Sequence, residues 1–130
     1  MSNIDQLIQQ AEGKTLEFKR DLSSPKPVMK TLVAFANTAG RKLLLGIDDN
    51  HNILGVAQPL DEEERLSNLI ADSISPRLVP SIELVTVDGK TLLVVEVYLS
   101  GSRPHWVNAE GTEQGVYTGW ALPTVRRIAN

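Results

Sequence analysis

The sequence contains no cysteine, and aromatic residues make up only 5% of it. Without cysteine the chain cannot form disulfides, thiolate zinc sites or iron–sulfur clusters, and it has no thiol nucleophile. It also lacks a run of about 18 apolar residues, which a membrane-spanning helix needs. The first residues have neither the positive charge nor the apolar stretch of a secretory signal. These absences predict a cytoplasmic location and no membrane partner.

Three common nucleotide and hydrolase motifs are missing as well. The phosphate-loop pattern Gly-x-x-x-x-Gly-Lys-Ser/Thr, the dinucleotide pattern Gly-x-Gly-x-x-Gly and the hydrolase pattern Gly-x-Ser-x-Gly do not occur. The two histidines, His51 and His105, have no partner at metal-ligand spacing. The sequence therefore argues against a P-loop ATPase, a dinucleotide-binding enzyme and a serine hydrolase.

What is present indicates one globular domain with an uneven charge. The 130 residues are 42% apolar and 22% charged, which predicts a single domain over residues 1–130. The net charge is −3, but residues 12–42 hold seven basic and three acidic residues, and residues 43–130 hold six basic and twelve acidic ones. The first third is thus a locally basic surface on an acidic domain. It would suit a phosphate backbone, or it is an ordinary solvated face.

The apolar periodicity predicts an α+β fold, with a mixed β-sheet containing hairpins and flanked by helices. Helices are expected from about residue 3 to 11, 27 to 37, 61 to the residues before Pro76, and from 123 onward. Strands are expected at 15–19, 43–47, 53–56, 81–87, 91–98 and 115–118, where 43–47 with 53–56 and 81–87 with 91–98 form hairpins. The segment 35–40, which includes Asn37 and Gly40, reads as a helix C-terminus.

Carboxylates near the first strand form a candidate catalytic and metal site. Glu12 and Glu17, with Asp48 or Asp49 as the third acid, would hold Mg²⁺ or Mn²⁺, because grouped acids around a divalent cation are the usual equipment for phosphodiester cleavage. Lys19 would stabilise the charge on the phosphate. The alternative is a solvated acidic rim beside an aspartate-rich turn.

Basic side chains form a candidate nucleic-acid-binding set. Its members are Lys14, Lys19, Arg20, Lys30, Arg41, Lys42 and Arg103. Near the last of them, Trp106 would stack on a base, or it belongs to the core.

Several segments in order give the chain a resemblance to a known family. They are residues 12–19 (Glu-Gly-Lys-Thr-Leu-Glu-Phe-Lys), 34–40 (Ala-Phe-Ala-Asn-Thr-Ala-Gly), 43–49, 53–56, 74–76, 88–90 and 103–104. Together they resemble the Schlafen-type AlbA domain, also called the divergent AAA domain and associated with DNA binding. The chain departs from the family pattern at Arg41, where a glycine is usual, and around Tyr117, where a following arginine is absent.

The resemblance implies a mixed sheet flanked by helices, placed as the N-terminal module of a longer transcriptional regulator. In animal Schlafen proteins a similar domain is an endoribonuclease, whose three carboxylates correspond by motif to Glu12, Glu17 and Asp48. Two such lobes form a basic groove there, so a single-lobed chain would form it as a homodimer.

Three functions are therefore open at this stage. The first is a nucleic-acid-binding domain, for DNA or RNA, of a transcriptional regulator. The second is a metal-dependent nuclease using the three carboxylates. The third is a dimerisation or ligand-sensing domain.

Overall fold

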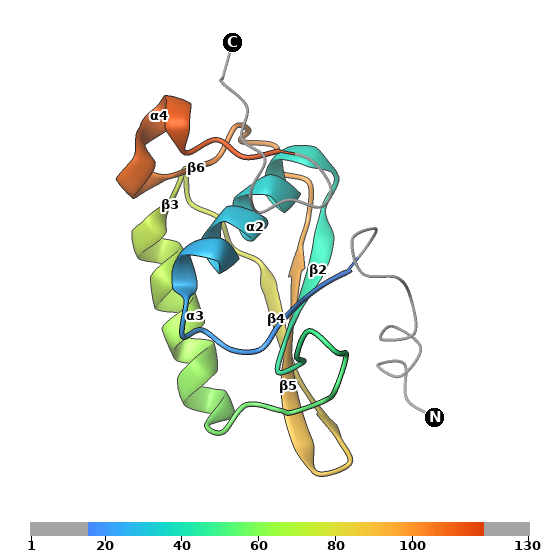
Figure 1. Cartoon of the computed structure of the whole chain (residues 1–130). Coiled ribbons are helices and arrows are strands. Elements are labelled where there is room, and N and C mark those ends of the chain that lie inside the picture. The colour runs from blue at the N-terminus through green and yellow to red at the C-terminus, as the bar shows by residue number, and fades with distance from the viewer. Residues whose placement is uncertain (1–15, 119–130) are drawn as a thin grey trace.

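The computed structural model describes residues 16–118, and α2 and α3 lie side by side on one face of its main sheet (Figure 1). The main strands are β1 (Leu16–Lys19), β2 (Arg41–Leu45), β4 (Ser81–Val87) and β5 (Lys90–Val97). The helices are α2 (Pro25–Thr38), α3 (Pro59–Ser73), the 3-10 turn η1 (Asn108–Glu110) and α4 (Gly111–Gln114). The short strands β3 (Ile74–Ser75) and β6 (Trp106–Val107) form a second sheet.

The main sheet has the strand order β1-β2-β5-β4. β1 runs parallel to β2, with Glu17 beside Leu43, while β2–β5 and β5–β4 are antiparallel. α2 makes the crossover that a parallel pair requires. The sheet is therefore mixed and contains a hairpin, which confirms the predicted fold class.

Both faces of the sheet carry apolar side chains because β2 and β5 are almost continuous apolar runs. On the helical face, Leu43, Leu45 and Val95 pack with Leu32 of α2 and Leu66 of α3. On the opposite face a second cluster gathers around the sheet residues Leu16, Phe18, Leu44, Leu92 and Val94. The predicted central strand is thus buried on both faces.

Prolines and a glycine set the limits of the two long helices. Pro25 and Pro59 occupy the first turns of α2 and α3, where a missing N–H costs nothing. After α2, the Gly40 N–H donates to the Phe35 carbonyl (2.9 Å), and Gly40 has a φ of +75°. This turn leads directly into β2, so β1 and β2 become neighbours. None of the helices in residues 16–118 has the length and apolarity that crossing a bilayer requires.

Two local predictions were wrong. Residues 53–56 form no second hairpin arm, because only Ile53 bridges to Ile47. Residues 115–118 form no strand element, and β6 with α4 precedes them instead. These segments are held by isolated hydrogen bonds rather than by an apolar pattern. The helices predicted at 3–11 and from residue 123 lie outside the described residues.

Candidate nucleic-acid interface

Lys19 and Arg20 stand together at the end of β1, on the loop that leads to α2. Parallel pairing fixes this end, because the Lys19 carbonyl accepts hydrogen bonds from the N–H groups of Gly46 (2.8 Å) and Ile47 (3.3 Å). Arg20 is exposed, and the Lys19 side chain is 24% exposed. With Asp21, Ser23, Ser24, Pro27 and Val28 they line a cavity of about 190 Å³. The positively charged side chains of Lys19 and Arg20 thus lie next to each other, on backbone that is held by hydrogen bonds to β2 and the residues after it.

The loop after Arg20 is held by its own polar groups. The Asp21 carboxylate accepts hydrogen bonds from the Ser23 hydroxyl (2.6 Å) and N–H (2.9 Å). These bonds, the hydroxyl one first, hold the pKa of Asp21 below its ordinary value. The side chain of Leu22 is fully buried, and its N–H donates to the Glu62 carboxylate of α3 (3.3 Å). The loop is therefore anchored to the core on one side while Arg20 faces outward.

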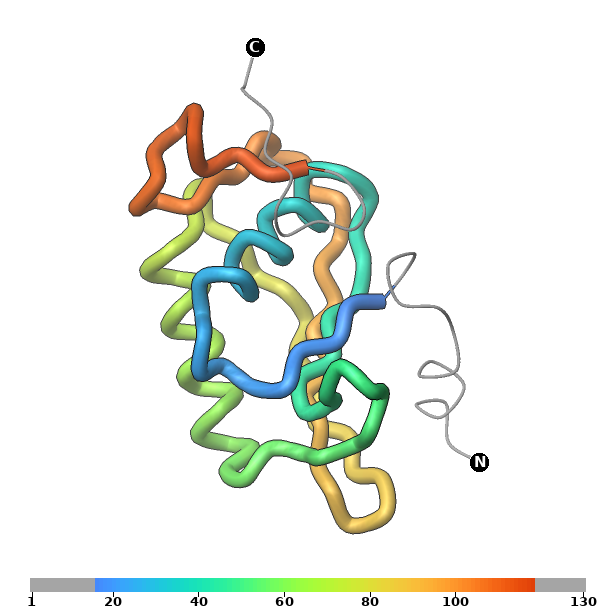
Figure 2. Tube along the Cα trace, in the orientation of Figure 1, coloured from blue at the N-terminus to red at the C-terminus, as the bar shows by residue number. Residues whose placement is uncertain are grey.

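The start of α2 adds to the positive potential of this loop. A helix N-terminus carries about half a positive charge. The first turn of α2 contains no acidic residue, and Lys26 in that turn is exposed. Arg20 and Asp21 also line a second cavity, of about 350 Å³, with Glu62 and residues 54–58. In the trace of Figure 2 the β1–α2 loop passes next to that segment. We call residues 19–28, which run from the last residue of β1 through the connecting loop to the first turn of α2, the β1–α2 basic loop.

The carboxylates of the predicted metal site are only partly within the described residues. Glu12 lies outside them. Glu17 is in β1, with its carboxylate 4.0 Å from Lys19 Nζ. Asp48 follows β2 at the same end of the sheet as Lys19. The structure therefore places Glu17, Lys19 and Asp48 on adjacent segments.

Asp48 organises the turn that follows β2. Its Oδ1 accepts hydrogen bonds from the N–H groups of Asn52 (2.8 Å) and Asn50 (2.9 Å), and its Oδ2 accepts one from Asn52 Nδ2 (3.2 Å). These bonds, the Asn52 N–H first, lower the pKa of Asp48, and the charge of Arg20 lowers it further. Within residues 16–118 no three acidic or histidine side chains lie close enough to hold a metal ion. The described part of the chain thus supplies at most two of the three predicted ligands.

The remaining basic candidates lie apart from the basic loop. Lys30 is 3.8 Å from Glu110 and sits over the Tyr117 ring, 5.5 Å from its centre. Arg41 is only 8% exposed, and burial lowers the pKa of its guanidinium. Lys42 stands opposite Glu96 on the sheet face away from the helices. Of the described candidates, Lys19 and Arg20 are brought together, whereas Lys30, Arg41 and Lys42 occupy separate places. Lys14 lies outside the described residues.

Arg103 lies in the loop after β5. Its Nε donates to the Ser100 carbonyl (2.7 Å), and its side chain helps to line an open groove of about 420 Å³. The other lining residues are Asn37, Gly101, Pro104, Val116 and Thr118. Arg103 is exposed, so it remains a candidate for a phosphate contact at a place of its own.

The sequence did not reveal how Asn37 and His105 hold this loop. Asn37 Nδ2 donates to the carbonyls of His105 and Tyr117 (both 3.0 Å), and Asn37 Oδ1 accepts from the His105 N–H (2.8 Å). His105 is fully buried, and its ring nitrogens contact the Pro76 carbonyl (2.9 Å) and the Ser100 hydroxyl (2.5 Å). Trp106 is half-buried and pairs with Ser75 in the small sheet. Asn37 and His105 therefore hold the 100–107 segment in place.

The fold and the basic loop define the class of protein: an α+β domain with a mixed sheet, covered by two helices on one face. The chain belongs to the Schlafen, AlbA_2 family, whose model matches residues 12–118. This confirms the resemblance that the sequence segments indicated.

Solved structures that are similar to the chain include the following two. One is the solution NMR structure of the N-terminal domain of a RecG-related protein from Nitrosomonas europaea, which is 32% identical over 98% of this chain and 86% of that chain, with a TM-score of 0.71. The other is the crystal structure of the DIP2311 protein from Corynebacterium diphtheriae, at 18% identity and a TM-score of 0.61. That match covers 82% of this chain but 23% of the DIP2311 chain, and it shows the fold alone. No curated protein matches the sequence.

Proposed function

We propose that this domain binds nucleic acid as part of a transcriptional regulator. The observation that carries the proposal is the β1–α2 basic loop, where Lys19 and Arg20 are presented together beside the N-terminus of α2. Phosphate oxygens bind readily at such a place, because two cations and a helix N-terminus all favour negative charge. We place this function in the cytoplasm, as the sequence predicted.

The family and one structural neighbour support this proposal. The chain is a Schlafen, AlbA_2 member, and the Nitrosomonas europaea protein is described as related to the ATP-dependent DNA helicase RecG. A relation to a DNA helicase favours a nucleic-acid partner for the domain. The whole chain has a net charge of −3, so binding depends on the local loop and not on the overall charge.

Contacts between basic side chains and phosphates contribute to the affinity for nucleic acid but do not distinguish one base sequence from another. Lysine and arginine bound to phosphates release counterions, so affinity falls as salt rises. Arg20 can bind a phosphate through two parallel hydrogen bonds, while Lys19 acts as a point charge. We also propose that the domain acts as a homodimer, since two copies would present two such loops to one nucleic acid.

A metal-dependent nuclease is the second candidate function. It is favoured by the parallel pairing of β1 and β2, which puts Glu17, Lys19 and Asp48 on adjacent segments. Carboxylates suit Mg²⁺ or Mn²⁺ as ligands, and such an ion polarises phosphate oxygens. Glu17 and Asp48 would hold it together with Glu12. Asp48 fits this role incompletely, because it already accepts three hydrogen bonds from Asn50 and Asn52.

One titration separates the two functions. A fluorescent DNA duplex and a structured RNA would be titrated with the protein at low salt, in EDTA and in Mn²⁺, following anisotropy and then strand length on a gel. The binding proposal predicts salt-sensitive binding in EDTA that weakens about tenfold or more in the double variant Lys19→Ala/Arg20→Ala. Equal affinity of the wild type and this variant would contradict it.

The control variants keep the charge or remove a carboxylate. Lys19→Arg keeps both positive charges and leaves the two phosphate hydrogen bonds of Arg20 in place, so it should bind within about threefold of the wild type. Cutting that requires Mn²⁺ and disappears in Glu17→Gln would establish the nuclease function instead.

A further inference from the structure

The outer edge of β4 is open in the part of the chain that the structure describes. β4 is the last strand in the order β1-β2-β5-β4, and no strand in residues 16–118 pairs with its far side. A two-residue turn, Asp88-Gly89, joins it to β5, with Val87 opposite Lys90. Both turn residues have positive φ (52° and 77°), as a type I′ hairpin turn requires.

The turn determines which backbone groups point outward. Antiparallel pairs alternate between hydrogen-bonded and non-hydrogen-bonded, and the pair next to a two-residue turn is hydrogen-bonded. The opposing residues Thr86 and Thr91 therefore share no backbone hydrogen bond, although their hydroxyls are 3.0 Å apart, and the Thr91 carbonyl indeed accepts from the Val56 N–H (2.8 Å). It follows that Ile82, Leu84 and Thr86 direct their N–H and C=O groups to the open edge.

This edge has few of the features that prevent strand pairing. Soluble proteins protect open edges with proline, lysine, bulges or very short strands. β4 is seven residues long, Ser-Ile-Glu-Leu-Val-Thr-Val, with a single charge at Glu83 and no proline. Leu84 is 36% exposed, and Val79 just before the strand is 71% exposed. Such an edge is suited to accept another strand.

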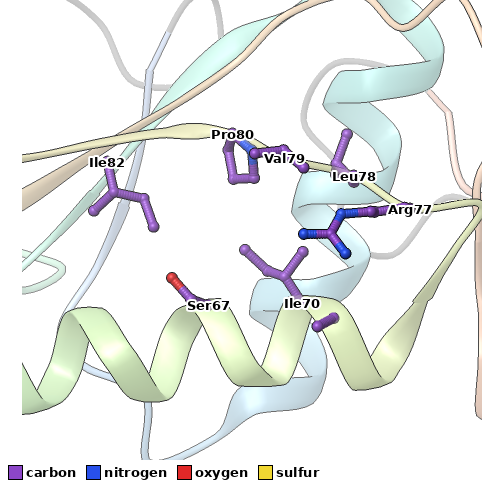
Figure 3. Close-up of a pocket in the computed structure, with 8 residues that line it drawn as sticks. Ser67, Ile70, Arg77, Leu78, Val79, Pro80 and Ile82 are labelled. Atoms are coloured by element: carbon purple, nitrogen blue, oxygen red, sulfur yellow. The ribbon is translucent and has the colours of Figure 1, made fainter.

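A groove beside the edge would receive side chains of an added strand. It has a volume of about 190 Å³ and lies between α3 and residues 77–82, as Figure 3 shows. Ile70 and Ile82 give it an apolar floor, Ser67 lies on the α3 side, and the Arg77 guanidinium points into it. In strand addition, the main chain supplies the hydrogen bonds while such a groove accepts alternate side chains.

We propose that the added strand is β4 of a second copy, paired antiparallel with Leu84 at the two-fold axis. In this register Leu84 pairs with the partner's Leu84, and Ile82 with the partner's Thr86. All three outward-facing residues of each copy then form hydrogen-bonded pairs. Glu83 stands opposite the partner's Val85, so no like charges meet. The two four-stranded sheets become one sheet of eight strands.

Other symmetric registers are less favourable. Centring the pairing on Glu83 would oppose two carboxylates at the closest pair spacing and bring Pro80, which has no N–H, into the ladder. Centring it on Val85 would set Ile82 opposite the turn residue Asp88, which has positive φ. The register at Leu84 is therefore the one that the sequence of β4 favours.

Charge on α3 complements this arrangement. The two-fold axis puts both helical layers on the same face, with α3 antiparallel to the partner's α3. The first half of α3 is acidic and includes the exposed Asp61 and Glu64. That half would then approach the partner's Arg77, so opposite charges meet. This inference rests on the homodimer proposed above and is independent of whether the domain binds nucleic acid.

A cysteine scan tests the interface directly, because the chain has no cysteine of its own. In Leu84→Cys the two Cα atoms would lie about 5.5 Å apart, which is within disulfide reach. Mild oxidation, or a short bis-maleimide, should convert most of this variant to a covalent dimer. The control Leu54→Cys, on a loop residue of similar exposure (39%), should give only background. Equal cross-linking of the two variants would overturn the proposal.

Sedimentation equilibrium distinguishes the remaining outcomes. The wild type should have twice the 14.3 kDa chain mass, and Leu84→Lys should be a folded monomer by circular dichroism, since an edge lysine blocks pairing. A dimer that persists in Leu84→Lys, without cross-linking of Leu84→Cys, would overturn the β4 interface but leave the homodimer standing. A monomeric wild type would overturn both, and the nucleic-acid titration would still stand by itself.

Discussion

Asn37 and His105, 68 residues apart in sequence, are joined through a pair of hydrogen bonds between one side chain and one backbone unit. Asn37 Nδ2 donates to the His105 carbonyl (3.0 Å), and Asn37 Oδ1 accepts from the His105 N–H (2.8 Å). A third bond ties Asn37 to the Tyr117 carbonyl. The end of α2 thus fixes the segment that carries Arg103.

Replacing Asn37 should destabilise the fold. Asn37→Ala removes three hydrogen bonds and leaves backbone groups of His105 and Tyr117 without this partner, which should cost about 2–4 kcal/mol. Asn37→Asp should cost at least as much, because a carboxylate cannot donate to the two carbonyls. Urea unfolding measures both, and Asn68→Ala on the exposed face of α3 should change stability by less than about 0.5 kcal/mol. A loss for Asn37→Ala no larger than this control would contradict the structural role of Asn37.

Gly40 should tolerate no side chain, because it approaches β5 closely. A Cβ at this position would lie 2.8 Å from the Leu99 nitrogen and 2.9 Å from the Val97 oxygen, and the φ of +75° adds strain. Gly89 has almost the same φ (+77°) but open space around it. Gly89→Ala should therefore cost about 1–2 kcal/mol for the backbone alone, and Gly40→Ala clearly more. If thermal or urea unfolding shows that Gly40→Ala and Gly89→Ala lose the same free energy of unfolding, then β5 can move away from the added Cβ at residue 40, and the prediction is wrong.

The Asp48 turn should make stability depend on acid pH. Hydrogen bonds from Asn52 and Asn50 lower the pKa of Asp48 in the folded state, so its charged form stabilises the fold. This contribution is complete above the unfolded pKa near 3.8 and is lost as the pH falls through the lower folded value. The melting temperature of Asp48→Asn should lie below that of the wild type at pH 6, and the two should converge as the pH falls below 3.8 and through the lower folded pKa. A difference in melting temperature between the wild type and Asp48→Asn that stays the same at every pH would contradict this role of the Asp48 carboxylate.

The sequence predicted the elements that have strong apolar patterns. β2 could be recognised from Leu43, Leu44 and Leu45, which are all fully buried, and the β4–β5 hairpin from Asp88-Gly89. The single bridge at Ile53 and the short β6 could not be predicted, because isolated backbone bonds leave no periodic pattern in the sequence. The apolar pattern and the family resemblance both predicted the fold class, which the mixed sheet confirms, and the family match confirms the resemblance.

The candidate site was predictable only in part. Neighbouring residues such as Lys19 and Arg20 remain neighbours in any fold, so their clustering could be expected. The burial of Arg41 and the ion pair of Lys30 with Glu110 depend on tertiary contacts with segments more than 50 residues away. A count of charges along the sequence cannot show which of them face the solvent.

The most direct test of the central claim is the salt dependence of DNA binding. The logarithm of the association constant would be plotted against the logarithm of salt concentration for the wild type, Arg20→Ala and Lys19→Ala/Arg20→Ala. Each phosphate contact on duplex DNA contributes about 0.9 to the slope. We expect the slope to fall by about 0.9 in the single variant and by about 1.8 in the double variant, with unchanged thermal unfolding. Parallel lines for all three proteins would contradict the claim that Lys19 and Arg20 contact phosphates.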